Sequence, residues 1–197
     1  MARNMQPILK RCRTLGISPS VMGIDKSSNR NPNPMRKKQS EYGRQLTEKQ
    51  KVKFIYGMLE KQFRHLYEIA SKMPGVAGEN FLQLLESRLD NVVFRLGLAN
   101  TRRESRQIVN HGHVLVNGKK VDIPSYRVKV GDVITLKEKF AGSDKLKSII
   151  EANSSRAVPK WLDMDKNTLT GKVIALSQRD DIDFEVEEHL IVELYSK

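Results

Sequence analysis

Side chains that bind phosphate recur between residues 102 and 110. An α-helix turns ~100° per residue, so one arc of roughly 140° is shared by Arg102, Arg103, Arg106, Gln107 and Asn110. Guanidinium groups donate paired hydrogen bonds to phosphate oxygens. Arginines in a first turn are unfavourable for an isolated helix, because the helix dipole is positive at that end. A bound anion makes their electrostatic energy favourable. We therefore predict a polyanion-binding helix face; the alternative is a merely solvated charged face.

A capping box and a hairpin turn position these side chains. Thr101 and Glu104 have the S/T-x-x-E spacing that starts a helix at the residue after the threonine. An apolar run at 114–116 follows the helix. The dipeptide Asn117-Gly118 is typical of a two-residue β-hairpin, because both residues tolerate positive φ. The sequence therefore predicts a small helix-plus-hairpin module.

The rest of the hairpin places lysines at its tip. Lys119 and Lys120 follow the turn, and Val121 and Ile123 alternate with polar residues on the expected return strand. A second short pair of strands is expected on either side of the turn at 131–132. The module thus combines arginines on a helix with lysines at a loop tip.

Two amphipathic helices are expected before this module. A capping box at Thr47 starts a 25-residue helix that ends before Pro74. Asn80 is expected to cap a second helix, which Gly97 ends. Their apolar stripes should pack on one another. After the module, the pattern predicts a helix over 144–151, a strand over 172–176 and a C-terminal helix.

Positive charge is concentrated in two regions. The chain of 197 residues has a formal net charge of +12, which favours nucleic acid or another anionic surface as partner. Residues 1–53 contain 13 Lys or Arg and 3 Asp or Glu, and residues 81–140 contain 11 and 6. No apolar run is long enough to span a membrane, and the single cysteine excludes an internal disulfide.

The basic arm at residues 1–43 lacks a sustained apolar period, and four prolines interrupt it. On its own it cannot bury enough apolar surface to fold. We expect it to become ordered against a partner that neutralises it. The alternatives are a solvated tail and a basic import or surface-binding signal.

The acidic end of the chain has the opposite charge, since residues 177–197 contain 2 Lys or Arg and 7 Asp or Glu. Such a surface repels RNA. We expect a basic protein neighbour to contact it at Asp180, Asp181, Asp183 and Glu185. The alternative is that it folds back onto the basic helices.

Catalytic and metal-binding patterns are weak. The sequence contains no G-x-S-x-G, P-loop or G-x-G-x-x-G pattern, and one cysteine with four scattered histidines does not supply a zinc spacing. His111-Gly-His113 is expected to cap a helix end and to place imidazoles near RNA rather than to bind a metal. The alternative is a purely structural turn. The triplet Arg88-Leu89-Asp90 resembles the catalytic R-L-D of pseudouridine synthases. We interpret Asp90 instead as a surface carboxylate or an intramolecular salt-bridge partner.

Four stretches in order resemble the family of protein four of the small ribosomal subunit. They are SEYGRQLTEKQKVKFIYGMLEKQFRHLYEIA (40–70), LESRLDNVVFRLGLANTRRESRQIVNHGHVLVNG (85–118), VPKWL (158–162) and EHLIVELYSK (188–197). Many members carry four N-terminal zinc-binding cysteines, whereas this arm has only Cys12. The chain is therefore similar to the bacterial zinc-free type, and no cofactor is carried over.

The resemblance implies an α+β fold: a mainly helical N-terminal domain, a small helix-and-β-hairpin RNA-binding module (S-four-type, alpha-L motif) and a basic N-terminal extension. The expected divisions are an extension at 1–44, a helical domain at 45–85 and the RNA-binding domain at 86–150. At 151–197 we expect a strand and a C-terminal helix that packs back on the helical domain.

The resemblance also implies a function and partners. Such a protein is a cytoplasmic, non-enzymatic, structural part of the small subunit. It binds a multi-helix junction in the 5′ domain of the ribosomal RNA early in assembly. Its other implied partners are mRNA, near the channel through which mRNA enters, and small-subunit proteins five and three. It is linked to decoding accuracy, some members repress their own mRNA, and neither a membrane nor a small-molecule substrate is implied.

Combining charge and resemblance gives two sets of expected RNA contacts. Those in the first half of the chain are Arg3, Lys10, Arg11, Arg13, Arg36, Lys37, Lys38, Arg44, Lys49 and Lys53. Those in the module are Arg102, Arg103, Arg106, Gln107, Asn110, His111, His113, Asn117, Lys119 and Lys120. We expect recognition of RNA shape through phosphates and 2′-hydroxyls, since few aromatic residues fall in these segments. A free RNA chaperone or translational repressor and an RNA-modifying enzyme are the alternative classes.

Overall fold

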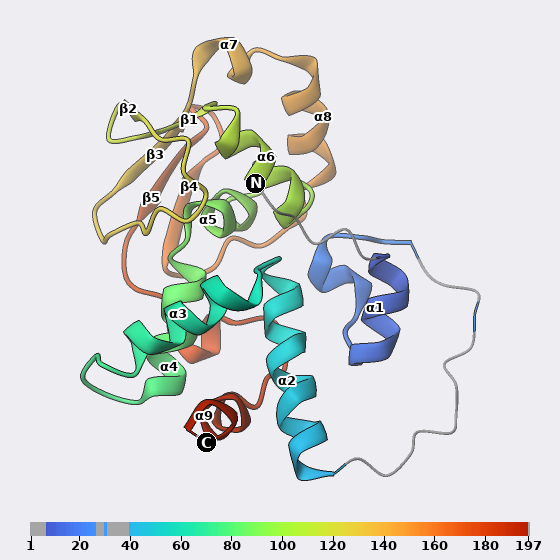
Figure 1. The fold of residues 1–197 in the computed structure, drawn as a ribbon. Helices are drawn as coiled ribbons and strands as arrows, with labels where there is room; N and C mark the ends of the chain where they lie inside the picture. Colours follow the sequence, from blue (N-terminus) through green and yellow to red (C-terminus); the bar gives the residue numbers. More distant parts are fainter. Residues whose placement is uncertain (1–6, 27–29, 31–39, 197) are drawn as a thin grey trace. The chain divides into compact units, whose positions relative to one another are not determined.

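The computed structural model describes residues 7–26, 30 and 40–196. The expected RNA contacts Arg3, Arg36, Lys37 and Lys38 lie outside the described residues. The chain divides into two compact units (Figure 1). The first ends at Leu82 and is completed by Ile182–Lys197, and the second is Gln83–Asp181.

The first unit is helical. Its elements, in chain order, are α1 (Ile8–Leu15), the 3₁₀ helix η1 (Pro19–Met22), α2 (Glu41–Ile55), α3 (Glu60–Ala70), the start of α4 (Ala77–Glu86) and α9 (Glu188–Ser196). Aromatic rings fill its core, where Phe63 and Phe81 meet edge to face with their centroids 4.8 Å apart. Figure 1 shows α9 beside α2, and the Gln45 amide of α2 donates to the Glu193 carboxylate of α9 at 2.9 Å. The C-terminal helix is therefore part of this unit.

The single helix expected from Thr47 to residue 70 is two helices. Gly57 adopts φ +62°, which favours glycine, and the chain turns there between α2 and α3. The Thr47 capping box is also wrong, since the Thr47 hydroxyl donates to the Gly43 carbonyl inside α2 at 2.8 Å. The actual N-cap is Ser40, whose hydroxyl oxygen accepts from the Gly43 N–H.

The second expected helix is also interrupted. α4 begins at Ala77, ahead of the expected cap Asn80, whose amide instead donates to the Pro74 carbonyl at 3.1 Å. α4 ends at Glu86, and α5 (Leu89–Arg95) begins after the extended residue Arg88. The apolar residues expected along these helices are buried, namely Phe81, Leu84, Leu85, Leu89, Val92, Val93 and Leu96. The apolar periodicity thus identified the core but not the break in the helix.

The basic arm has more structure than its composition predicts. α1 and η1 lie within it, and their apolar residues Cys12, Leu15, Ile17 and Met22 are buried. The expectation that the arm becomes ordered only against a partner is therefore wrong for the part that the structure describes, because α1 packs on α2 of the same chain.

The second unit combines helices with one antiparallel sheet. Its helices are the end of α4, α5, α6 (Arg102–Asn110), α7 (Glu138–Ala141), α8 (Asp144–Ala152) and the 3₁₀ helix η2 (Arg179–Asp181). Its strands are β1 (Val114–Val116), β2 (Lys119–Lys120), β3 (Val133–Leu136), β4 (Leu162–Asp165) and β5 (Thr170–Val173). They pair in the order β2-β1-β3-β5-β4. Trp161 lies in the core of this unit.

The hairpin turn matches the prediction, but the strands around it differ. Asn117 and Gly118 have φ of 50° and 75°, and Val116 pairs with Lys119. Val121 and Ile123 lie beyond the two-residue strand β2. No strand pair forms across the turn at 131–132, because β3 pairs with β1 and β5 instead.

The unit boundary differs from the expected division at residue 150. β4 and β5 lie beyond that residue, yet β5 pairs with β3 through Val133 and Lys172. Residues 151–181 therefore complete the sheet of the second unit, and only the segment from Ile182 onward joins the helical unit. The α+β fold class, with a mainly helical N-terminal domain, is confirmed.

Candidate nucleic-acid interface

The capping box at the start of α6 is present. The Thr101 hydroxyl oxygen accepts from the Glu104 N–H at 3.2 Å, and the Glu104 carboxylate accepts from the Asn100 N–H at 3.0 Å. Ser105, Ile108 and Val109 on the opposite side of the helix are buried. The N-terminal end of α6 is therefore fixed from both sides of the cap.

Arg102 is a correction to the expected RNA-binding face. Arg102 is only 6% exposed, and its Nε donates to the side-chain oxygen Oδ1 of Asn91 at 2.9 Å. Its guanidinium also stacks on the Phe94 ring, 4.4 Å from the centroid. At the first position of the helix the side chain turns back onto α5. The arc calculated from helix geometry therefore wrongly placed Arg102 on the exposed face.

The other residues of the arc remain accessible to different degrees. Arg103 and Gln107 are exposed, whereas Arg106 and Asn110 are partly buried. Arg106 Nη1 lies 3.3 Å from Asp90 Oδ2, with its side chain 25% exposed. These four residues form a polar helix face that can receive phosphate.

Asp90 is a buried salt-bridge partner. Arg88 donates to both of its carboxylate oxygens, at 3.0 Å from Nε and 2.6 Å from Nη2. The salt-bridge interpretation of the R-L-D triplet is confirmed, and the surface alternative is wrong. Asp90 was not among the expected contacts; it lies in the first turn of α5, which packs against α6.

The hairpin tip holds exposed lysines on a fixed turn. Lys119 and Lys120 are exposed, and Lys120 lies 3.5 Å from the Asp122 carboxylate. The Asn117 amide donates to Asp132 at 2.8 Å, while its oxygen accepts from the Val133 N–H. Asn117 therefore links the turn to the start of β3. The sequence predicted it only as an RNA contact and not in this structural role.

The two histidines follow the end of α6. His111 is exposed at the C-cap, and the His113 ring stacks on Phe140 with centroids 4.4 Å apart and planes 10° apart. Burial lowers the pKa of His113, and the nearby charges of His111, Lys137 and Lys145 lower it further. The last two lysines were not predicted. The cluster of lysines at 137–147 could have indicated that positive charge lies near His113. These lysines lie outside the predicted hairpin, so they were not included among the expected RNA contacts.

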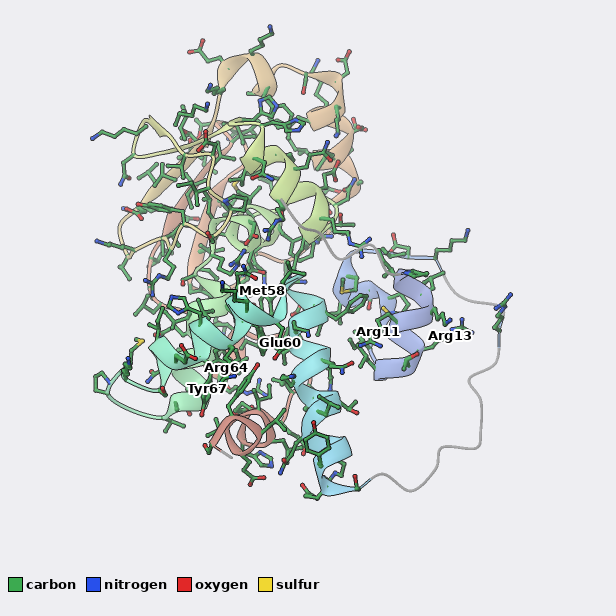
Figure 2. The ribbon with its side chains drawn as sticks, in the orientation of Figure 1. Arg11, Arg13, Met58, Glu60, Arg64 and Tyr67 are labelled. Atoms are coloured by element: carbon green, nitrogen blue, oxygen red, sulfur yellow. The ribbon has the colours of Figure 1, made fainter. Side chains whose placement is uncertain are left out.

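Lys49 and Lys53 on α2 are tied to a carboxylate. Their Nζ atoms lie 2.8 Å and 2.6 Å from the Glu60 oxygens, and the Tyr195 hydroxyl donates to Glu60 at 2.9 Å. Burial alone raises the pKa of Glu60, but these three donors outweigh it and lower that pKa to about 2. Burial and the bond to Glu60 raise the pKa of Tyr195. The cluster lies between α2, α3 and α9; Figure 2 labels Glu60 on α3.

The cations of the arm point in different directions. Figure 2 shows Arg11 on the side of α1 that faces α2, where it donates to Gln50, and Arg13 on the other side. Lys10 is exposed. Arg44 on α2 is exposed too, and pairs with Glu41 at 3.5 Å and Glu187 at 3.7 Å. Of these three cations of the arm, Lys10 is exposed, whereas Arg11 and Arg13 are both partly buried.

The acidic residues lie along one stretch of chain. Asp180 is exposed, and Asp181 accepts from the Gln178 N–H at 2.8 Å. Asp183 and Glu185 are exposed in an extended segment whose alternate residues are buried, namely Ile182, Phe184 and Val186. This alternation faces the carboxylates outward. A basic surface could therefore pair with them.

The described residues hold neither a metal cluster nor a membrane-spanning helix. Among residues 7–26, 30 and 40–196, no group of three His, Cys, Asp or Glu side chains could hold a metal ion. In the same ranges, no helix has the length and apolarity needed to cross a membrane. What the described surface does offer is arginine, lysine and amide groups fixed on a helix and a hairpin of one unit.

Comparisons with known proteins agree with this arrangement. The family model of the S4 domain matches residues 87–134, and the model of the ribosomal protein S4/S9 N-terminal domain matches residues 3–86. The small ribosomal subunit proteins uS4 of Lachnoclostridium phytofermentans and Agathobacter rectalis are 59% identical over 198 residues and 56% identical over 197 residues. That of Fusobacterium nucleatum is 50% identical over 198 residues.

Each of these matches covers 100% of both chains. The relatives carry the name of a ribosomal protein and not of an enzyme, as the prediction of a non-enzymatic chain requires. The resemblance seen in the sequence is thereby confirmed. The chain belongs to the uS4 family of small ribosomal subunit proteins.

Proposed function

We propose that this chain is a structural component of the small ribosomal subunit in the cytoplasm, where it binds ribosomal RNA. Family membership supports this role. The observation that carries RNA binding is the fixed set of cations in the second unit. The α6 face and the hairpin tip belong to one core, so their charges keep a constant spacing.

The proposed ligand is a multi-helix junction in the 5′ domain of the RNA, bound early so that it nucleates assembly. The major groove of an RNA duplex is too narrow for side chains to read, so the protein recognises shape through phosphates and 2′-hydroxyls. Arg103 and Arg106 supply forked contacts, and Lys119 and Lys120 supply point charges. Arg102 attaches the start of α6 to Asn91 of α5 and does not contact phosphate.

We also propose contacts beyond ribosomal RNA. Exposed cations of the arm and of α2, such as Lys10 and Arg44, form the surface that lies near the channel through which mRNA enters. The exposed carboxylates Asp183 and Glu185 contact a basic neighbour, small-subunit protein five, and protein three lies nearby. Through the contact with protein five the chain contributes to translational accuracy. The charge and the exposure of these side chains support both proposed contacts.

A salt titration tests RNA binding directly. If about eight phosphates are neutralised, log K for the junction should fall against log[salt] with a slope of about −6. The measurement is filter binding of the full chain to the isolated junction at 50–300 mM KCl, with a duplex of equal length as control. A flat response, or equal affinity for junction and duplex, contradicts the proposal.

A further inference from the structure

One carboxylate in the second unit serves two guanidinium groups. Arg88 occupies both oxygens of Asp90, and Arg106 shares Oδ2 at 3.3 Å. These three side chains together have a formal charge of +1. Arg88 and Asp90 are buried, whereas a quarter of the Arg106 side chain is exposed. This positive charge thus reaches the surface at Arg106.

The backbone holds this carboxylate in place independently of the arginines. The Asp90 N–H donates to the Pro124 carbonyl at 3.1 Å, and the Asp90 carbonyl accepts from the Ser105 hydroxyl at 2.6 Å. Ser105 is fully buried and directly precedes Arg106 in α6. Asp90 is therefore a fixed point against which α6 and its arginine are set.

We propose that Asp90 is a positioning residue for RNA recognition: its buried carboxylate holds the Arg106 guanidinium so that the exposed edge meets an RNA phosphate. This inference rests on the proposed function. An arginine that is already held loses less conformational freedom when phosphate binds, which raises affinity without a new contact.

Positioning and simple charge predict opposite signs for the same substitution. Asp90→Asn removes a negative charge, so long-range electrostatics alone would make RNA bind more tightly. If Asp90 positions Arg106, the substitution weakens binding instead, by about fivefold, the size expected for one side chain that must be immobilised on binding. Asp144→Asn is the matched control, because it makes the same charge change at a side chain that is 99% exposed.

A double-mutant cycle ties the effect to Arg106. Arg106→Gln should weaken binding of the full chain to the isolated junction by about tenfold in the natural background, as for one charge-assisted hydrogen bond. In the Asp90→Asn background the same substitution should cost less than about twofold, since the held geometry is already lost. A purely structural role of Asp90 would lower the melting temperature but leave the two Arg106 effects equal.

A second variant guards against misfolding. Asp90→Asn leaves the buried Arg88 without its partner, whereas Arg88→Met with Asp90→Asn removes both charges and leaves the net charge unchanged. This double variant should show the same loss of affinity as Asp90→Asn. Binding as tight as that of the natural chain in either folded variant, or an undiminished Arg106 effect, overturns the inference alone. Failure of the natural chain to bind the junction overturns the proposed function and the inference with it.

Discussion

Single side chains decide how much of the positive charge faces outward. Several cations that the sequence offers as contacts are engaged inside their own unit: Arg102 by Asn91, and Lys49 and Lys53 by Glu60. The Glu60 carboxylate partly neutralises the charges of Lys49 and Lys53, whereas Arg102 is buried against a neutral amide. The number of basic residues therefore overstates the charge available to an anion.

The Glu60 cluster gives a pH dependence with a defined sign. Its folded pKa, about 2, lies below the ordinary value of 4.5, so the cluster contributes stability that is complete above about pH 4.5 and disappears as the pH falls through 2. Glu60→Gln should lower the free energy of unfolding at pH 7. The difference from the natural chain should shrink as the pH falls from 4.5 toward 2, as measured by urea unfolding.

The control for this prediction lies on the same helix. Glu68 forms an exposed pair with Arg64 at 3.4 Å, and such surface pairs contribute little. Glu68→Gln should therefore leave the pH profile unchanged in shape. A Glu60→Gln difference that stayed constant from pH 7 to pH 2 would show that the carboxylate charge has no part in holding Lys49, Lys53 and Tyr195.

Which side chains were predictable follows from the range of the interactions. The Thr101 cap and the Asn117-Gly118 turn depend on neighbours within four residues, and the sequence alone predicted both. The burial of Arg102 depends on Asn91, eleven residues away, and on Phe94. The Asn117 bond to Asp132 spans fifteen residues. Contacts at such separations require the fold, so periodicity could not find them.

Whole elements show the same division between local and long-range causes. The apolar periodicity correctly identified the buried face of the helices on either side of Gly57 and Ser87, but not the turns that interrupt them. The one strand expected after residue 150, at 172–176, was placed outside the RNA-binding domain, and β4 was not predicted as a strand. The sheet forms by pairing distant strands, as at Val133 and Lys172, and a single sequence contains no local signal for that register.

The strand β5 also yields a prediction about packing. A Cβ at Gly171 would lie 2.4 Å and 2.9 Å from the two methyl carbons of Leu96 in the core. Gly171→Ala should therefore destabilise the protein by about 1–3 kcal/mol through overpacking, measured by thermal unfolding. Gly142→Ala is the control, because among the described residues its Cβ would meet the Glu138 carbonyl at 3.7 Å, an ordinary contact, and its φ is −78°. Equal melting temperatures for the two variants would mean that Leu96 can move aside.

For the molecule as a whole, the question is whether net charge or its placement determines binding. The formal net charge of +12 attracts any polyanion, and this attraction is long-ranged and not selective. The proposed interface adds fixed geometry in one unit: an arginine face on α6 and lysines at a hairpin tip. The two contributions separate when the same number of charges is removed from different places.

Three glutamine substitutions at Arg103, Lys119 and Lys120 lower the formal net charge from +12 to +9 within the interface. The matched control makes the same charge change at exposed lysines elsewhere, namely Lys61, Lys72 and Lys166. The interface variant should lose about 100-fold or more in affinity for the junction, because each phosphate contact contributes roughly 1–2 kcal/mol, while the control should lose only a few-fold. The measurement is filter binding at 100 mM KCl with both triple variants checked for folding by circular dichroism. Equal losses would mean that net charge alone attracts the RNA and that the helix and hairpin do not form its binding surface.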